Sequence, residues 1–277
     1  MPGPGMLLPV DYNDFLGDVE ETEFPSGLQT LRFHSRFNQS LDDATLPSGL
    51  QTMTFGMSFN QCLDETTLPS GLQSLTFGRM LNQSLDYTTF PTGLQTLQFG
   101  GWFKQKLDNT ILPSGLQNLI FGAQFDHSLD KTTLPIGLKN LQFGAMFNQK
   151  LDNTILPNGL HTLSFGEEYN QTLNNTTLPS GLQTLQFGII NEYDDVRRSM
   201  FNHGLANTRL PTGLQTLIFG AKFNQGLSST TLPSGLRTLA FGESFNQSLA
   251  NVRLPCGLQT LTFEASYPQH RPLDVAL

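Results

Sequence analysis

The sequence predicts a β-rich solenoid that places one short parallel strand in each turn of 22 residues. The motif Leu-Pro-Ser-Gly-Leu-Gln-Thr-Leu, or a close variant, recurs from Pro25 to Pro255, and its prolines are 22 residues apart at every step except one of 32. A fixed period in this range is typical of solenoids, because a single turn cannot bury its apolar face without stacking on the next. The eleven copies of the motif predict about eleven stacked turns.

A strand is predicted where apolar and polar residues alternate within each period. In one copy Met53 and Phe55 flank Thr54, which is the pattern of a half-buried strand. Glycine follows the strand in nine of the eleven copies, as Gly56 does here, and it predicts a corner that needs positive φ or close backbone approach. The rest of the period has no helical pattern, so we expect an outer side that is extended or contains only short turns.

A column of asparagines after the second phenylalanine of the period is predicted to form a ladder. We expect each side chain to point inward and to bond the backbone of the neighbouring turn. Lysine accepts no hydrogen bond, so we expect a local departure at Lys104. The column consists of Asn38, Asn60, Asn82, Lys104, Asp126, Asn148, Asn170, Asn202, Asn224 and Asn246.

A second column holds aspartate in six turns, from Asp42 to Asp152. Carboxylates at roughly 5 Å spacing repel one another unless each is hydrogen-bonded or bridged by a cation. We expect each to form an Asx turn with the threonines that follow it. Calcium is the alternative, but the glycine-rich nonapeptide of calcium-binding β-rolls is absent, and alanine takes this place at Ala206 and Ala250. We therefore expect no metal or other cofactor.

The elements Leu-x-x-Leu-x-Phe-Gly, Phe-Asn-Gln and Leu-Pro-x-Gly at this period resemble the FNIP repeat, a variant leucine-rich repeat. The resemblance covers residues 24 to about 263. It implies a right-handed, leucine-rich-repeat-like coil, and it implies that the repeats serve protein–protein interaction. The chain departs from the family pattern where proline often follows Phe-Asn, since that place holds residues such as Ser40 and Cys62.

The period divides the chain into three parts. Residues 1–23 keep the phase of the repeat at Phe15 and Val19 but are rich in acids, so we expect an acidic N-terminal cap. Residues 24–263 form the solenoid. Residues 264–277, where the pattern dissolves, are expected to be a C-terminal cap or tail.

Candidate binding residues are those that the repeat does not reserve for stacking. Trp102 is the only tryptophan, and it shares a variable column with Met80 and Met146. Exposed tryptophan often anchors protein interfaces, and Ile120 on the next strand is expected to extend this patch. The alternative is that Trp102 folds over the corner glycines and shields the core.

The 32-residue step supplies a second group of candidates, because it contains an insert at residues 189–200. We expect this insert to project as a loop, and loops on rigid scaffolds concentrate binding residues. A neutral surface insertion is the alternative, since a longer loop costs little chain entropy. The candidates are Tyr193, Asp194, Arg197 and Arg198.

The charge and hydropathy of the chain argue against nucleic acid and membranes as partners. The formal net charge is −8, and an acidic chain with scattered bases lacks the basic face that nucleic acid or an anionic membrane requires. No segment has the roughly 20 apolar residues needed to cross a bilayer, and no secretory signal begins the chain. Cys62 and Cys256 are too far apart in the stack for a disulfide. We expect a soluble cytoplasmic or otherwise intracellular protein with two free thiols.

Together these observations predict a non-catalytic protein–protein interaction scaffold. The five histidines do not share one phase of the repeat, and neither a dinucleotide-binding glycine motif nor a P-loop is present, so we expect no enzyme activity. The main alternative is a structural or self-associating solenoid. Ice binding is a remote alternative, because threonine recurs on the outward strand positions but a second outward column mixes Arg, Gln, Ile and Ala.

Overall fold

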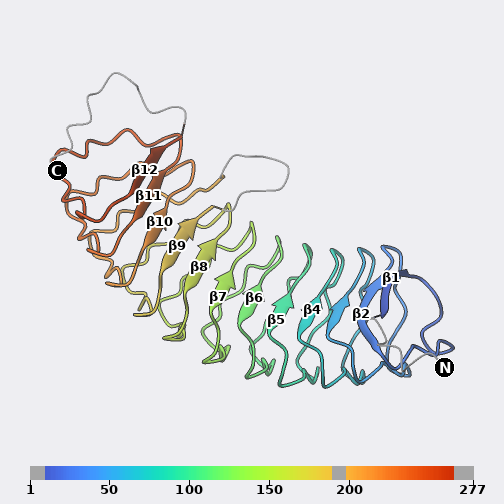
Figure 1. Cartoon of the computed structure of the whole chain (residues 1–277). Coiled ribbons are helices and arrows are strands. Elements are labelled where there is room, and N and C mark those ends of the chain that lie inside the picture. The colour runs from blue at the N-terminus through green and yellow to red at the C-terminus, as the bar shows by residue number, and fades with distance from the viewer. Residues whose placement is uncertain (1–9, 189–197, 265–277) are drawn as a thin grey trace, which may run out of the picture.

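The computed structural model describes residues 10–188 and 198–264, which form one parallel sheet of twelve strands in sequence order (Figure 1). The predicted β-rich solenoid of about eleven turns is confirmed. The strands are β1 (Val10–Phe15), β2 (Leu28–Phe33), β3 (Thr52–Thr54), β4 (Ser74–Thr76), β5 (Thr96–Gln98), β6 (Asn118–Ile120), β7 (Asn140–Gln142), β8 (Thr162–Phe165), β9 (Thr184–Phe187), β10 (Thr216–Ile218), β11 (Thr238–Phe241) and β12 (Thr260–Phe263).

Neighbouring strands pair in the register that the repeat dictates. Thr52 of β3 lies opposite Ser74 of β4, its equivalent in the next turn. The 32-residue step does not disturb this register, because Thr184 of β9 lies opposite Thr216 of β10. The longer step therefore leaves the pairing of β9 with β10 unchanged.

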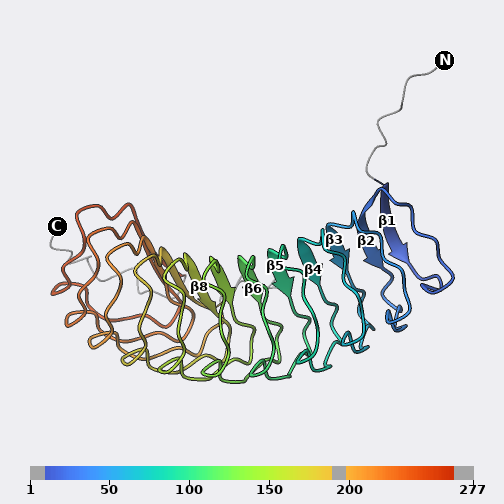
Figure 2. The ribbon, with the colours of Figure 1, turned by 90° about the horizontal axis from the view of Figure 1, so that it is seen from below.

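The sheet lines the inner side of a curved molecule, and the remaining segments of the turns form its outer side (Figure 2). No residue within 10–188 or 198–264 is helical, and hence none of that region could cross a bilayer as a helix. The outer side consists of extended segments and tight β-turns, as predicted. Each Pro-x-Gly-Leu forms such a β-turn, in which, for example, the Leu72 amide donates to the Pro69 carbonyl over 3.0 Å.

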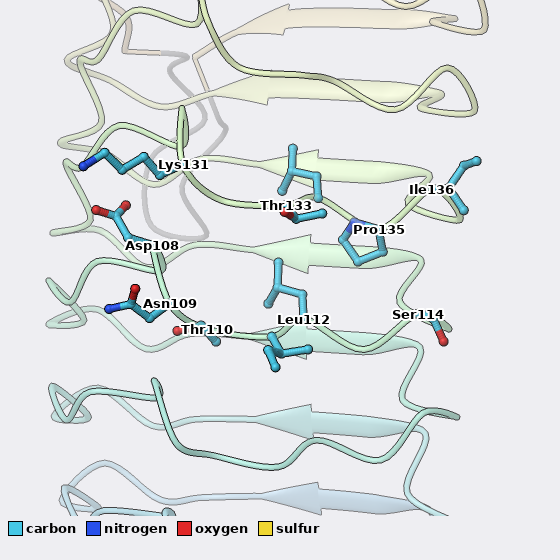
Figure 3. Close-up of a pocket in the computed structure, with 11 residues that line it drawn as sticks. Asp108, Asn109, Thr110, Leu112, Ser114, Lys131, Thr133, Pro135 and Ile136 are labelled. Atoms are coloured by element: carbon cyan, nitrogen blue, oxygen red, sulfur yellow. The ribbon is translucent and has the colours of Figure 1, made fainter.

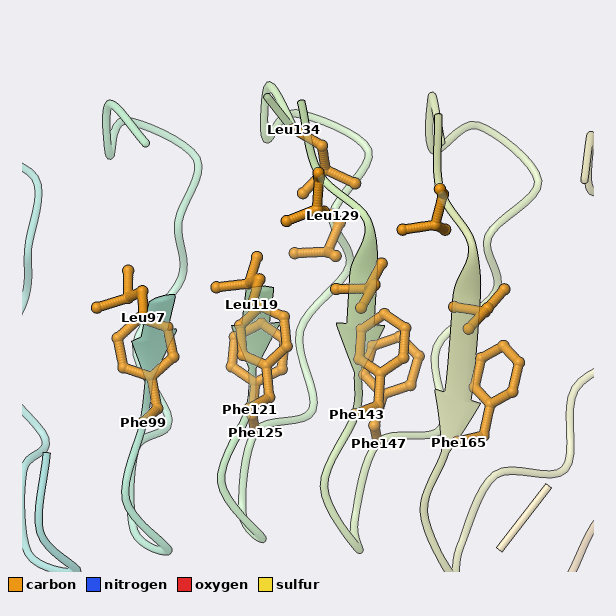
Figure 4. Close-up of a cluster of buried hydrophobic side chains, with 14 of the residues drawn as sticks. Leu97, Phe99, Leu119, Phe121, Phe125, Leu129, Leu134, Phe143, Phe147 and Phe165 are labelled. Atoms are coloured by element: carbon orange, nitrogen blue, oxygen red, sulfur yellow. The ribbon is translucent and has the colours of Figure 1, made fainter. Parts of the chain in front are cut away.

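Leucine and phenylalanine side chains fill the space between the sheet and the outer segments (Figure 4). Two phenylalanines of one turn, Phe121 and Phe125, stack with their ring centroids 4.0 Å apart. Phe121 also stacks on Phe143 of the next turn, at 5.6 Å. Each turn thus buries its rings against its neighbours, which is how a chain with short strands obtains a continuous core.

The glycine after each strand allows neighbouring corners to touch. A Cβ atom on Gly100 would lie 1.7 Å from the carbonyl oxygen of Gly78, and one on Gly122 would lie 1.7 Å from that of Gly100. The φ angles at these glycines are not positive; among the described glycines only Gly188, at the corner before the insert, has a positive φ, of 85°. Close backbone approach therefore explains the regular corners.

The asparagine ladder is confirmed, but its side chains do not point inward. Asn38 Oδ1 accepts a hydrogen bond from the amide of Asn60 over 2.8 Å, and Asn60 Oδ1 accepts one from Asn82 over the same distance. Asn38 is exposed and the other two are half-buried. The inward orientation is therefore wrong, because these bonds run along the surface from one turn to the next.

The ladder lapses at Lys104, where a departure was expected. The Lys104 amide donates to Asn82 Oδ1 over 2.9 Å. Its own side chain has no acceptor, and within the described residues no side-chain oxygen takes up the amide of Asp126. The ladder resumes beyond this point, because Asp126 Oδ1 accepts the amide of Asn148 over 2.8 Å.

The aspartate column also links neighbouring turns, so the predicted Asx turns are wrong. Asp42 Oδ1 accepts a hydrogen bond from the Thr66 hydroxyl of the next turn over 2.9 Å. The local turn is closed instead by Ser40, whose Oγ accepts the Asp42 amide over 3.1 Å. Thr66 is buried, and a buried hydroxyl requires a partner. The aspartate is thus the acceptor for a buried threonine.

This second ladder has one lapse in the first half of the chain. Thr132 is buried and its hydroxyl has no partner, although Asp108 occupies the place from which the acceptor should come. No three metal-ligating side chains converge within residues 10–188 and 198–264. Cys62 and Cys256 are both free, as predicted, and both are exposed.

The two ends of the sheet differ from the regular turns. β1 lies in the acidic segment before the first copy of the motif, and it adds a strand that the motif does not predict. Its pairing with β2 contains register shifts, and Asp14 has a φ of 68°. Phe15 and Val19 of this segment are buried. Of the predicted C-terminal cap or tail, residues 265–277 lie outside the described part of the chain.

Candidate functional site

Three of the predicted binding residues, Met80, Trp102 and Met146, lie at the corner where the chain leaves the sheet. Met200, which was not predicted and is the last residue of the insert, takes the same place in its turn. We refer to Met80, Trp102, Met146 and Met200 as the corner ridge. Trp102, Met146 and Met200 are 41%, 52% and 44% exposed, so about half of each side chain faces solvent.

Backbone hydrogen bonds between neighbouring turns hold the residues of the corner ridge in a regular row. The Trp102 amide donates to the carbonyl of Arg79 in the preceding turn over 2.8 Å, and the Met146 amide donates to that of Ala123 over 2.8 Å. These bonds extend the regularity of the sheet to the corner. Gln124 lies between Trp102 and Met146 in the same column, and Glu168 lies between Met146 and Met200, so polar side chains interrupt the ridge at two turns.

Arg79 lies against the ring of Trp102. Its guanidinium carbon is 5.5 Å from the ring centroid, which is within the range of a cation–π interaction. The contact braces the tryptophan from the preceding turn while part of its surface remains exposed. Trp102 and Arg79 thus form a preorganised pair, and both residue types are enriched at protein interfaces.

Ile120 lies on the inner face of the sheet and not on the corner ridge. It ends β6 and is half-buried. The neighbouring column on the same face of the sheet is polar, and its side chains are hydrogen-bonded to one another. Asn118 Nδ2 donates to Thr96 Oγ1 over 3.1 Å, and Asn140 Nδ2 donates to Asn118 Oδ1 over 2.6 Å. Ile120 is therefore an apolar position on a largely polar face.

Most of the predicted loop candidates fall outside the described residues. Tyr193, Asp194 and Arg197 belong to segment 189–197, which the structure does not describe. Arg198 follows this segment and is exposed. The described chain resumes at Arg198, two residues before Met200 of the corner ridge.

Sequence reasoning missed a groove on the outer side of the solenoid. It has a volume of about 610 Å³ and lies between the outer segments 108–114 and 131–136 of two adjacent turns (Figure 3). Ile111 and Ile136, which are 80% and 88% exposed, stand at the groove. We call it the isoleucine groove. Its other apolar lining residues are buried: Leu112, Leu134 and Pro135.

A polar pocket of about 350 Å³ adjoins the isoleucine groove, and the two share Asp108 and Lys131. The apolar groove therefore ends in a charged region. The signal for this site was present in the sequence, because Ile111 and Ile136 break columns that otherwise hold polar residues. The other residues that line the polar pocket are Lys106, Asp126, His127, Ser128, Asp130 and Gln149.

Two solved structures share this architecture. CroV588, described as a novel circular LRR protein structure, is 34% identical with a TM-score of 0.74, over 89% of this chain and 38% of CroV588. This chain thus spans less than half of that protein. YopM from Yersinia enterocolitica WA-314 is 21% identical with a TM-score of 0.54, over 86% of this chain and 47% of YopM, which is a likeness of fold alone. No curated protein matches the sequence.

The sequence model of the FNIP Repeat matches the chain six times. The matched segments cover residues 19–189 and 201–244, which is most of the solenoid on both sides of the insert; they are 19–56, 37–80, 81–124, 125–168, 147–189 and 201–244. The corner glycines and the Asn ladder from Asn38 to Asn224 lie within these segments. The chain therefore belongs to the FNIP repeat family.

Proposed function

We propose that the chain is a non-catalytic scaffold that binds other proteins, with the corner ridge as its principal contact. The observation that carries this proposal is the exposure of large apolar side chains in one column, where Trp102, Met146 and Met200 each leave about half of their surface in solvent. Soluble proteins seldom expose apolar residues in an ordered row without a partner for them.

The chemistry of the corner ridge fits a protein partner. Tryptophan and arginine are over-represented among the residues that dominate binding energy, and Trp102 and Arg79 lie in contact. Methionine adapts to irregular surfaces because its side chain is unbranched and polarisable. The backbone ladder at the corner fixes these side chains before binding, which lowers the entropy lost on association.

The loop residues Tyr193, Asp194, Arg197 and Arg198 complete the proposed surface, since they precede Met200 of the corner ridge closely in the sequence. Ile120 on the inner face is a secondary contact in this proposal. A partner that covers both the corner and the insert would reach the adjoining edge of the sheet.

A binding experiment with matched variants tests this proposal. The variants are Trp102→Gln with Met146→Gln, because glutamine is what Gln124 supplies in the same column, and a separate deletion of residues 189–197. We expect proteins captured from cell extract by the wild-type chain, and quantified by mass spectrometry, to be lost with these variants. The control Ser244→Ala changes a distal place in the same column. Retention of all partners by the ridge variant would overturn the assignment.

A self-associating solenoid is the second candidate, because the last described strand is incompletely covered. Leu261 and Phe263 of β12 are partly buried, whereas their equivalents Leu239 and Phe241 are buried. CroV588 is described as circular and is longer than this chain, which gives a precedent for extending such a stack. Sedimentation velocity distinguishes the candidates: this alternative requires the sedimentation coefficient to rise with protein concentration, and a constant monomer value rejects it.

A further inference from the structure

We infer that the isoleucine groove binds an extended segment of a partner protein that carries aliphatic side chains beside aspartate or glutamate. This inference rests on the proposed function, because it assigns a partner class to a protein-binding solenoid. It concerns a different surface, however, since the groove lies on the outer side and the corner ridge lies where the chain leaves the sheet.

Three isoleucines make the outer side apolar in successive turns. Ile111 and Ile155 occupy a column that holds glutamate in the first copy of the motif and threonine or arginine in the remaining copies. Ile136 occupies a column that holds serine, threonine, asparagine or cysteine elsewhere. Ile155 is 87% exposed, which is comparable with the other two. None of the three is needed for stacking, because the polar residues in the same columns are compatible with the same fold.

The isoleucine groove opens where both side-chain ladders lapse. Lys104 provides no acceptor for the amide of Asp126, and the buried Thr132 hydroxyl receives no acceptor from Asp108. Both missing bonds lie between the same two turns, those that line the groove. Because these bonds elsewhere tie the outer side of one turn to the next, their coincident loss explains why the gap is found here.

The walls of the groove favour an extended occupant. They are two adjacent chain segments, 108–114 and 131–136, whose labelled side chains line the space between them along its length in Figure 3. Such a gap fits a single strand-like segment better than a helix, whose diameter is about 10 Å or more. Leu112 and Leu134 at the groove offer an apolar contact to alternate side chains of that segment.

The charges around the groove favour an acidic occupant. Five of the six lysines in the chain lie between residues 104 and 150, although the whole chain has a net charge of −8. Four of them are in the outer half of their turns and exposed, and no ion pair within the described residues neutralises them. These four are Lys104, Lys106, Lys131 and Lys150.

The carboxylates nearby are mostly engaged within the protein. Asp126 accepts hydrogen bonds from the Asn148 amide and from Gln149, and Asp130 accepts one from Thr154. Asp108 is different, because within the described residues it accepts no hydrogen bond of the ladder, and it lies at the same end of the groove as Lys131 (Figure 3). It is the group that an acidic partner must tolerate.

Selection from a phage-displayed library of random dodecapeptides tests the inference. The full chain is the bait, and bound phage are counter-selected on the variant Ile111→Thr/Ile136→Ser/Ile155→Thr, in which each isoleucine becomes a residue of its own column. We expect the surviving peptides to share aliphatic residues flanked by aspartate or glutamate. Affinities of the synthetic peptides are then measured by fluorescence anisotropy at low and high salt.

Single variants separate the apolar and the charged contributions. We expect the triple isoleucine variant to weaken binding at least about tenfold, and Lys131→Asn to weaken it and to reduce its salt dependence. Asp108→Asn should strengthen binding, since it removes the carboxylate that faces an acidic peptide. The matched control Ile218→Thr, on the inner face, should leave the affinity unchanged, and circular dichroism verifies that each variant is folded.

Three results would overturn the inference. They are a selection that yields no peptide dependent on the isoleucines, a consensus that is basic or uncharged, and a rise in oligomer size that the triple variant abolishes, which would identify a second copy as the occupant. Peptides that require Trp102 but not the isoleucines would support the proposed function while rejecting the groove. If partners were lost with the ridge variant but retained by the triple isoleucine variant, the proposed function would likewise be supported and the groove rejected.

Discussion

Thr230 lies one turn beyond Ala206, and its buried hydroxyl has no hydrogen-bond partner. In the preceding turn the equivalent hydroxyl of Thr208 donates to Asn174 Oδ1 over 3.3 Å. Alanine offers no acceptor, so the second ladder ends at Ala206. Val252 takes the place of the threonine in the last turn, which shows that an aliphatic residue fits this position.

A double-mutant cycle measures the cost of this unpaired hydroxyl. We expect Thr230→Val to raise the free energy of unfolding by about 1 kcal/mol, because it removes a buried polar group of nearly the same shape. Ala206→Asn should stabilise the wild-type background by a similar amount, since it supplies the missing acceptor. In the Thr230→Val background, Ala206→Asn should not change the free energy of unfolding. Urea denaturation of the four proteins gives the coupling, and equal effects of asparagine in both backgrounds would contradict the explanation.

Tyr169 places a hydroxyl where the neighbouring turns have phenylalanine. Its ring stacks on Phe165 with centroids 3.8 Å apart, and its buried hydroxyl has no partner. Burial, with a smaller contribution from the charge of Asp152, raises the pKa of Tyr169 above its usual range. We expect Tyr169→Phe to stabilise the protein at neutral pH by about 1 kcal/mol, as measured by urea denaturation.

The raised pKa of Tyr169 also predicts a pH dependence. In the unfolded chain a tyrosine ionises near about pH 10, whereas the folded protein keeps the Tyr169 hydroxyl protonated to higher pH. Above about pH 10 the unfolded state releases this proton first, so the stability of the wild-type protein falls. The advantage of Tyr169→Phe should therefore grow between pH 9 and pH 11. The control Tyr87→Phe, at an exposed tyrosine, should show no such growth.

The sequence predicts the stack well because the period is a physical constraint repeated eleven times. A strand residue such as Met53, flanked by threonines, has only one orientation that buries it, and the equivalent residue of each turn repeats the same solution. The strand β1 escaped prediction because its segment lacks the Pro-x-Gly motif and pairs irregularly with β2. The direction of the Asn and Asp side chains also escaped it, since the period fixes spacing but not which backbone group a side chain reaches.

The candidate sites were harder to predict than the fold, because they depend on which adjacent turns lack the regular side-chain hydrogen bonds or carry an unusual residue. Trp102 and Met146 were predicted as binding residues because they are large apolar residues in a column whose residue type varies from turn to turn. Since they share one column, the sequence also predicted that both lie at the corner. Ile111 and Ile136 lie in different columns, and only the folded path of the chain brings them to one groove. No column, taken alone, reveals that the lapses at Lys104 and Thr132 fall between the same two turns.

Lys104→Asn should repair the first ladder. The asparagine would accept the amide of Asp126, as Asn82 accepts the amide of Lys104. We expect the free energy of unfolding to rise by about 1 kcal/mol, measured by urea denaturation. The control Lys139→Gln removes a lysine charge outside the ladder and introduces the glutamine that most turns carry in that column, so it should leave stability nearly unchanged. If the two variants behaved alike, loss of lysine charge and not the ladder bond would be responsible.

The corner glycines should tolerate no side chain, whereas the glycine of the first Pro-x-Gly should. A Cβ on Gly122 would lie 1.7 Å from the carbonyl oxygen of Gly100, while one on Gly27 would have no heavy atom within 4 Å. Neither residue has positive φ, so the difference is steric. We expect Gly122→Ala to destabilise the protein by about 3 kcal/mol, because two backbones must separate.

Gly27→Ala should instead be neutral or stabilise by about 0.5 kcal/mol, since alanine reduces the conformational entropy of the unfolded chain. Urea denaturation of the two variants beside the wild type compares them directly. Separation of the corner in Gly122→Ala should also increase amide hydrogen exchange at Gln124, whose amide donates to the carbonyl of Gly101 over 2.9 Å. Equal stability of the two alanine variants would mean that corners can separate without loss of the stack, and close approach would then not explain the recurrence of glycine.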